Sequence, residues 1–298
     1  MIEYLKSLNI YDIKSLKGFH NQILSGLYQG KEIVIRLSQR RSFEETMAEI
    51  SYLNQLSKIM NVVKAIQIEG SYVIEHQDYL LSFYEKLHMK HWYELSLTMK
   101  HHFNAGKALG QIHLFSMNQN QYSRKDYKKH PDIQLINELD PMIKTELKKT
   151  LKTIDSMKKE PNYYGLIHGD YLYSNLMYDK DKVCVIDFDD LEYNYYLYDI
   201  AVYIFYLLLG GDPMDMDLLA NLEVFNHFMR GYRSVNQETQ FDFKDINIFF
   251  RLRQLKLLAT INQLPITSLG TWQKKYIDLS IKQIKNHEKF VPIDFNYE

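Results

Sequence analysis

A single cysteine, Cys184, occurs among the 298 residues. One cysteine excludes a disulfide framework, and the sequence has no H-E-x-x-H pattern, so no zinc site of a familiar kind is indicated. Cys184 lies between two valines of an apolar run, which favours a packed core residue over a nucleophile. The lack of disulfides favours a reducing compartment, and we expect a cytoplasmic protein.

Strong net charge and long apolar segments are also lacking. The formal net charge of −1 gives no reason to expect nucleic acid or an anionic membrane as a partner. The longest apolar stretch, residues 200–209, is shorter than the roughly 20 residues of a membrane span and ends at a Gly-Gly-Asp-Pro sequence. The first residues lack the layout of a signal peptide, and 46% hydrophobic residues are ordinary for a globular protein.

Residues with a recognisable chemistry gather between positions 166 and 190. A short apolar strand leads into a loop with His168, Asp170 and Asn175, and a second apolar strand ends in an acidic cluster headed by Asp187. Phosphoryl transfer needs a carboxylate that orients the attacking hydroxyl and oxygen ligands that hold Mg²⁺ on the phosphates. In the kinase spacing, Asp170 is this carboxylate, and Asn175 and Asp187 are the metal ligands. The alternative is that the acidic residues form ordinary turns.

These motifs resemble those of the aminoglycoside phosphotransferase and choline kinase superfamily. The resemblance rests on His168-Gly-Asp170 with Asn175, on Ile186-Asp187-Phe-Asp189 and on Tyr198-Asp199-Ile-Ala. The Ile-Asp-Phe-Asp-Asp sequence is most similar to the homoserine-kinase-like and stress-response-kinase-like branch. The resemblance counts His168 and Asp199 with Asp170 as catalytic residues, and it implies that Asp199 braces the catalytic loop from beneath. An N-cap of a helix at 199–209 is the other reading of Asp199.

The resemblance also implies a fold. We expect an α+β, protein-kinase-like bilobal structure with a small antiparallel sheet lobe at residues 1–84 and a larger, mainly helical lobe at residues 85–298. The first lobe would bind the nucleotide, and the second would carry catalysis and the substrate site. No sequence feature indicates the oligomeric state.

Two apolar runs at 23–28 and 31–37 predict a hairpin that turns at Gln29-Gly30. Ile33-Val34-Ile35-Arg36 aligns with the kinase strand V-A-I-K, so Val34 would cover the adenine and Arg36 would reach the phosphates from the same strand face. The family has Lys at this place, and Arg is not an equivalent substitute. An exposed arginine at a sheet edge is the alternative.

A capping box at Ser42–Glu45 predicts a helix that runs to about residue 60. Glu49 lies on the apolar side of this helix and needs a partner, for which Arg36 is the expected residue. Glu45, one turn earlier, is the alternative glutamate.

Two nucleotide contacts are expected from chain order alone. Gly18 would belong to a phosphate-covering loop at 18–22, which lacks the pattern G-x-G-x-x-G, so a simple hairpin start is equally compatible. A hairpin at 72–76 and 79–84, reached through residues 62–70, would end in an adenine-binding hinge. This hinge consists of Ser82, Phe83, Tyr84 and Glu85.

The remainder of the chain has mainly helical periodicity. Helices are expected at 103–117, 132–159, 199–209 and near 213–232, 243–263 and 270–288, with His113 in the core.

The function expected from these features is phosphorylation of a hydroxyl group on a small molecule by Mg²⁺ and ATP or GTP. Asp189, Asp190 and Glu192, with the tyrosines at 193, 195, 196 and 198, suggest a cationic, amine-bearing acceptor. The alternative is that the acids are structural braces and the tyrosines are core. A nucleotide-binding pseudokinase or regulatory module is a rival function, supported by Arg36 and the glycine-poor loop. A kinase of protein Ser/Thr is disfavoured, because no Ala-Pro-Glu segment follows Asp187.

Overall fold

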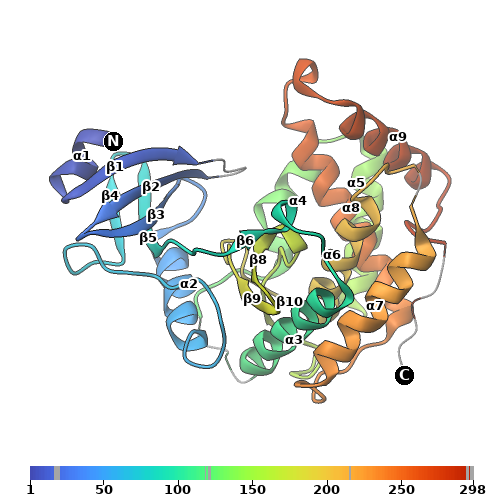
Figure 1. Ribbon diagram of the computed structural model, residues 1–298. Coiled ribbons are helices and arrows are strands. Elements are labelled where there is room, and N and C mark those ends of the chain that lie inside the picture. Colours follow the sequence, from blue (N-terminus) through green and yellow to red (C-terminus); the bar gives the residue numbers. More distant parts are fainter. Residues whose placement is uncertain (17–20, 118, 120–121, 215, 293–294, 296–298) are drawn as a thin grey trace.

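The computed structural model describes residues 1–16, 21–117, 119, 122–214, 216–292 and 295. Gly18, expected in a phosphate-covering loop, lies outside the described residues. Figure 1 shows a small sheet at one end of the molecule and a larger group of helices at the other. The expected pairing of a small antiparallel sheet with a mainly helical region is confirmed.

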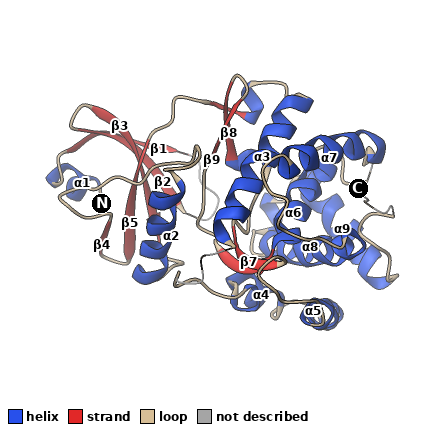
Figure 2. Cartoon of the chain, turned by 90° about the horizontal axis from the view of Figure 1, so that it is seen from below, coloured by secondary structure: helices blue, strands red, loops and turns tan. Residues whose placement is uncertain are grey.

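The first region contains a five-stranded antiparallel sheet in the order β1-β2-β3-β5-β4. Helix α1 (Ile2–Ser7) precedes it, and helix α2 (Phe43–Leu56) packs beside it (Figure 2). The strands are β1 (Ile10–Leu16), β2 (Gln22–Tyr28), β3 (Lys31–Ser38), β4 (Val73–His76) and β5 (Tyr79–Glu85). The predicted turn between β2 and β3 is present, with positive φ angles of 50° at Gln29 and 76° at Gly30. A two-residue turn with positive φ at both positions matches the right-handed twist of the strands.

Alternation along β3 divides the side chains between two faces. Ile33, Ile35 and Leu37 are buried in an apolar cluster with residues of β2 and β5. Val34 and Arg36 therefore lie on the opposite face, which looks toward the second region. Strand β3 thus carries two of the residues that the sequence assigned to nucleotide binding, Val34 and Arg36.

The second region is built from seven helices and two small sheets of described residues. The helices are α3 (Met99–Ser116), α4 (Pro131–Ile136), α5 (Pro141–Asp155), α6 (Tyr196–Leu209), α7 (Leu218–Arg233), α8 (Ile246–Asn262) and α9 (Thr271–Lys285). Strands β7 (Tyr164–Ile167) and β10 (Glu192–Tyr195) form one antiparallel pair. The other sheet has the order β6-β8-β9, from β6 (Lys90–His91), β8 (Leu176–Asp179) and β9 (Lys182–Val185).

Close packing of α3 against α7 fixes the frame of this region (Figure 1). A Cβ atom at Gly106 would lie 1.8 Å from the carbonyl oxygen of Phe228, so only glycine permits this helix crossing. Helix α6 is apolar on nearly every side and lies in the core, as does Cys184 on β9. Within the described residues, none of the helices combines the length and apolar character that a membrane span requires.

The segment 62–70 leads to the hairpin of β4 and β5 through isolated bridges, such as Ala65 with Tyr84. Two sequence expectations differ from the structure. The helix expected at 132–159 is two helices, because Pro141 has no N–H to continue the ladder and Asp140 caps a new start. Helix α6 begins at Tyr196, so Asp199 lies within its first turn and is not the N-cap.

Candidate active site

A cavity of about 1200 Å³ lies between the two regions. Strands β2 and β3, the segment after β5, the loop after β7 and helices α8 and α9 all contribute to its lining. Eight of the residues predicted to bind nucleotide, to catalyse transfer or to hold metal line it: Val34, Arg36, Glu49, Tyr84, Glu85, Asp170, Asn175 and Asp187.

Asp170 lies in the loop after β7 with both carboxylate oxygens engaged. Asn175 Nδ2 donates to Oδ2 over 3.1 Å and to the Asp170 carbonyl oxygen over 2.9 Å. Arg253 Nη2 of α8 donates to Oδ1 over 2.5 Å. The carboxylate is therefore held in one orientation, with its remaining lone pairs toward the cavity that it lines.

His168 and Asp199 lie beneath this loop and outside the cavity lining. The backbone N–H groups of His168 and Gly169 donate to the two carboxylate oxygens of Asp199 over 2.8 and 2.9 Å. His168 Nδ1 accepts the N–H of Asp170 over 3.3 Å, while Nε2 lies 3.1 Å from the carbonyl oxygen of Ile186. Both residues are fully buried, so the structure gives them the bracing position that the resemblance implied for Asp199.

Two further features hold this loop. His113, expected in the core, is fully buried and places Nε2 3.1 Å from Asp199 Oδ2, so it takes part in the brace. Gly169 has a φ of +81°, and a Cβ there would lie 2.2 Å from the carbonyl oxygen of Asp190. Glycine is required at this position for conformation and for space.

Asn175 and Asp187 present oxygen atoms suited to a divalent cation. Because Asn175 Nδ2 is bound to Asp170, its Oδ1 is left as an acceptor. Asp187 has an unusual positive φ of 60° and is exposed at the cavity lining, where the surrounding protein reduces the hydration of its carboxylate. This desolvation, followed by the negative charges of Asp189 and Asp170, raises its pKa to about 7, while Arg36 opposes the shift. Excess negative charge of this kind fits a site that receives a cation.

Within the described part of the chain, no group of three or more His, Cys, Asp or Glu side chains forms a metal cluster.

Arg36 and Glu49 form the expected pair. Arg36 Nη1 and Nη2 donate to the two oxygens of Glu49 over 2.9 and 2.6 Å, and both residues are at most 5% exposed. Glu45 is occupied elsewhere: it completes the capping box with Ser42 and lies 3.1 Å from Lys125. The Nε–H of Arg36 is buried without a partner among the described residues, so the guanidinium retains a donor at the cavity wall.

Apolar residues cover the part of the cavity where a base would lie. Ile23 and Val34 come from the first sheet, and Met177 and Ile186 face them from the second region. Tyr84 and Glu85 line this part, followed by Lys86 and Leu87, which the sequence did not indicate. Ser82 and Phe83 do not line it: Phe83 is fully buried in the apolar cluster of the first sheet, and Ser82 is 1% exposed. Of the four residues expected to form a hinge, Tyr84 and Glu85 line the cavity.

The acidic residues after Asp187 differ from the expectation. Asp189 lies 3.6 Å from Arg36 and 3.5 Å from Arg41, and Asp190 bonds Arg41 and lies 3.2 Å from His130. Burial alone would raise the pKa of Asp190, but His130 and Arg41 hold it well below its ordinary value. Both carboxylates line the cavity with cationic partners already in place.

Glu192 and the tyrosines do not line the cavity. Glu192 is 2% exposed on β10 and pairs with Lys256 of α8 over 3.4 Å. Tyr195, Tyr196 and Tyr198 are core residues, because they end β10 and begin the buried helix α6. The expectation that these residues surround a cationic acceptor is wrong for Glu192 and for these three tyrosines.

The sequence did not predict that two cationic residues of α8 belong to the site. Arg253 contacts Asp170, and Lys256 lies one turn farther along the same helix face. Residues three apart in a helix share a face, but nothing in the sequence distinguishes these two from surface lysines and arginines.

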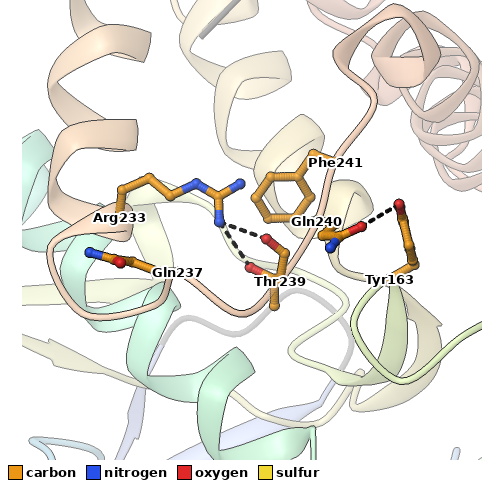
Figure 3. Close-up of a pocket in the computed structure, with 6 residues that line it drawn as sticks. All are labelled: Tyr163, Arg233, Gln237, Thr239, Gln240 and Phe241. Atoms are coloured by element: carbon orange, nitrogen blue, oxygen red, sulfur yellow. Dashed lines mark hydrogen bonds between the residues drawn. The ribbon is translucent and has the colours of Figure 1, made fainter. Parts of the chain in front are cut away.

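A separate hollow of about 400 Å³ lies near the end of α7 (Figure 3). Arg233 donates there to Thr239, and Tyr163 donates to Gln240 over 2.6 Å. Gln237 also lines the hollow, and none of the predicted site residues does.

Comparison with known proteins identifies relatives. The model of the phosphotransferase enzyme family APH matches residues 14–236 of the chain. The amicoumacin kinase of Bacillus subtilis (strain 168) is 22% identical over 302 residues, which cover 95% of this chain and 90% of that protein.

Solved structures resemble the whole chain. An amicoumacin kinase in complex with AMP-PNP and Ca²⁺ has a TM-score of 0.88 at 20% identity, covering 99% of this chain and 95% of that one. A microcompartment-associated aminopropanol kinase has a TM-score of 0.71 at 18% identity, with coverage of 96% and 98%. A spectinomycin phosphotransferase in complex with ADP and spectinomycin has a TM-score of 0.60 at 17% identity, with coverage of 96% and 92%. These likenesses establish the fold, and the expected protein-kinase-like fold class is confirmed.

Proposed function

Because the chain belongs to the phosphotransferase enzyme family, we propose that it transfers the γ-phosphoryl group of ATP or GTP to a hydroxyl group of a small molecule. The observation that supports this most directly is the arrangement of Asp170, Asn175 and Asp187. All three line one cavity, and a hydrogen bond joins Asp170 to Asn175. A carboxylate beside two oxygen ligands is what phosphoryl transfer requires of a protein.

In this proposal, Asp170 orients the acceptor hydroxyl and takes its proton. The hydroxyl oxygen forms the new bond to the γ-phosphorus, and the bond to the β-phosphate oxygen breaks to release the nucleoside diphosphate. Asp199 and His168 keep the loop of Asp170 in place through the contacts with its backbone. They act as positioning residues, because they do not line the cavity.

The nucleotide would lie against the first sheet. Val34 and Ile23 would cover the base, and the free Nε–H of Arg36 would bond a phosphate oxygen, while Glu49 fixes the guanidinium. Asn175 and Asp187 would hold Mg²⁺, which would neutralise part of the negative charge of the phosphates.

An amine-bearing acceptor remains part of the proposal. Arginine side chains already pair with five carboxylates of the cavity lining, which are Glu49, Asp132, Asp170, Asp189 and Asp190. Asp187 and Glu85 form no ion pair among the described residues, so these two carboxylates are the ones left to attract a cationic ligand. The relatives named for aminopropanol and spectinomycin support a small-molecule acceptor of this class.

An acceptor screen tests the function. The protein is incubated with Mg²⁺ and either ATP or GTP, and with amino alcohols, aminoglycosides, amino acids and neutral sugars. Release of nucleoside diphosphate is measured, and the phosphorylated product is identified by mass. We expect transfer to at least one amine-bearing hydroxyl compound. Asp179→Asn, a change at an exposed carboxylate at the end of β8, serves as the control and should retain the activity.

The rival function, a nucleotide-binding pseudokinase or regulatory module, predicts a different result in this screen. A pseudokinase would bind Mg·nucleotide in the same cavity and transfer phosphate to none of the acceptors. That result would refute the proposal and support the regulatory module.

A further inference from the structure

Arg253 is aimed at the reacting end of the cavity. Its Nη2 donates to Asp170 Oδ1 and, over 2.6 Å, to the hydroxyl oxygen of Tyr206, while Nε lies 3.2 Å from the same hydroxyl. The guanidinium also stacks on the Tyr206 ring, with 4.9 Å to the ring centroid. These contacts fix the plane of the guanidinium at the place where an acceptor hydroxyl would approach Asp170.

Arg253 has a third nitrogen, Nη1, beside those that contact Asp170 and Tyr206. The hydrogen bonds to Asp170 and Tyr206 use Nη2 and Nε, and the Arg253 side chain also interacts with the hydroxyl of Tyr198. Because Arg253 lines the cavity, Nη1 is the group from which a bound ligand would accept a further hydrogen bond.

Lys256 adds a second positive charge on the same face of α8. It is 1% exposed, lies 3.4 Å from Glu192 and 5.0 Å from the Tyr198 ring centroid, and lines the cavity one turn beyond Arg253. Burial alone would lower its pKa, but Glu192 and Tyr198 raise the pKa above its ordinary value, so Lys256 stays charged. Two charged cations, Arg253 and Lys256, therefore line the cavity near Asp170.

We propose that Arg253 determines acceptor specificity by binding a carbonyl or carboxylate oxygen that lies next to the reacting hydroxyl of the acceptor. The inference rests on the proposed function and deepens it. An ammonium group placed directly beside the hydroxyl would meet Arg253, whereas an oxygen acceptor would be bonded by Nη1. The amine of the acceptor is then held farther along the molecule, toward the carboxylates.

Matched acceptor pairs test this assignment. 4-Amino-2-butanol is compared with 4-amino-2-hydroxybutanamide, and 5-amino-2-pentanol with 5-amino-2-hydroxypentanamide. The two members of each pair have the same hydroxyl and amine, and a carboxamide replaces the methyl group on the hydroxyl-bearing carbon. The ratio of kcat/KM within a pair is measured with Mg²⁺ and the preferred nucleotide. We expect the wild-type ratio to favour the carboxamide by at least about tenfold, because a site built to donate hydrogen bonds discriminates against a ligand without the acceptor.

Variants assign the preference to the guanidinium. Arg253→Met removes both donor edges and should bring the ratio close to one, while Arg253→Lys, which keeps the charge without the planar fork, should give an intermediate ratio. Arg230→Met, at an exposed position of α7, should leave the ratio as in the wild type. A purely structural role of Arg253 would lower both values of a pair together and leave the ratio unchanged.

The outcomes separate the inference from the proposed function. Transfer to both members of a pair at equal kcat/KM, or a ratio that Arg253→Met does not alter, would overturn the inference and leave the function intact. The ratio of kcat/KM measured for the wild-type protein tests the inference even if a variant fails to fold. Binding of Mg·nucleotide without transfer to any acceptor would overturn the proposed function and the inference with it.

Discussion

The buried pair of Arg36 and Glu49 allows a quantitative prediction about stability. Each residue carries a charge in the interior, and the fork of Arg36 bonds both oxygens of Glu49. Removal of one partner leaves the other charge buried without compensation, which costs about 3–5 kcal/mol. We therefore expect Arg36→Met and Glu49→Gln each to lower the free energy of unfolding by roughly this amount, with Glu49→Gln at the lower end because the amide still accepts a hydrogen bond.

The double variant Arg36→Met/Glu49→Gln distinguishes a pair from two independent residues. It removes both charges, so no buried charge is left without compensation, and its free energy of unfolding should exceed the additive expectation by about 2–3 kcal/mol. Urea unfolding measures all four proteins, and an unchanged dependence on urea concentration shows that the comparison is of stability alone.

Glu45→Gln provides the matched control. Glu45 lies one turn earlier on α2, and its ion pair joins it to Lys125, which is half exposed. Glutamine also completes a capping box, so we expect a loss of less than about 1 kcal/mol. Additive single-variant losses, or a loss for Glu45→Gln as large as for Glu49→Gln, would refute the assignment of the pair.

Two further predictions concern the metal site and acid stability. Asp187→Ala should weaken binding of Mg·nucleotide by at least about tenfold, because one of two protein ligands is lost; unchanged affinity in a Mg²⁺ titration would contradict the metal assignment. His102 of α3 is 5% exposed, and burial lowers its pKa to about 4. Its folded pKa lies below the unfolded value, so its contribution to stability is lost as the pH falls from about 6.5 toward 4. His102→Gln should reduce this loss of stability by at most about 3 kcal/mol, whereas His88→Gln, at an exposed histidine, should not change it. The free energy of unfolding is measured against pH for both variants. An equal pH dependence in the two would contradict the interpretation that His102 is buried in its neutral form.

The parts of the site that the sequence predicted are those with a local or periodic signature. Asp170, Asn175 and Asp187 follow short strands at fixed spacings, and all three line the cavity. Arg36 and Glu49 were expected to meet because one lies on the outward face of a strand and the other is a carboxylate on the apolar side of a helix. The alternation of side chains along a strand and the period of side chains around a helix can be read from the sequence and hold in the folded protein. This contact was therefore predictable.

The neutralised acids and the cations of α8 depend on contacts that no local pattern contains. Arg41 approaches Asp190 from a turn 149 residues earlier, and Arg253 reaches Asp170 from 83 residues later. In the sequence, a charged residue that completes a buried cluster looks the same as one that faces solvent. The acidic run after Asp187 was for this reason assigned to a cationic ligand, although protein side chains already balance Asp189 and Asp190.

The central claim is that Asp170 orients the acceptor hydroxyl and takes its proton during phosphoryl transfer. The variant Asp170→Ala tests this claim most directly. Phosphoryl transfer to the best acceptor and the Kd of Mg·nucleotide are measured on the same preparations of wild type and variant. We expect transfer to fall by at least about 100-fold, as for loss of a general base, with the Kd changed by no more than a few-fold, because Asp170 faces the acceptor. Retained turnover would remove Asp170 from the mechanism, and a large loss of nucleotide affinity would place it among the nucleotide ligands instead.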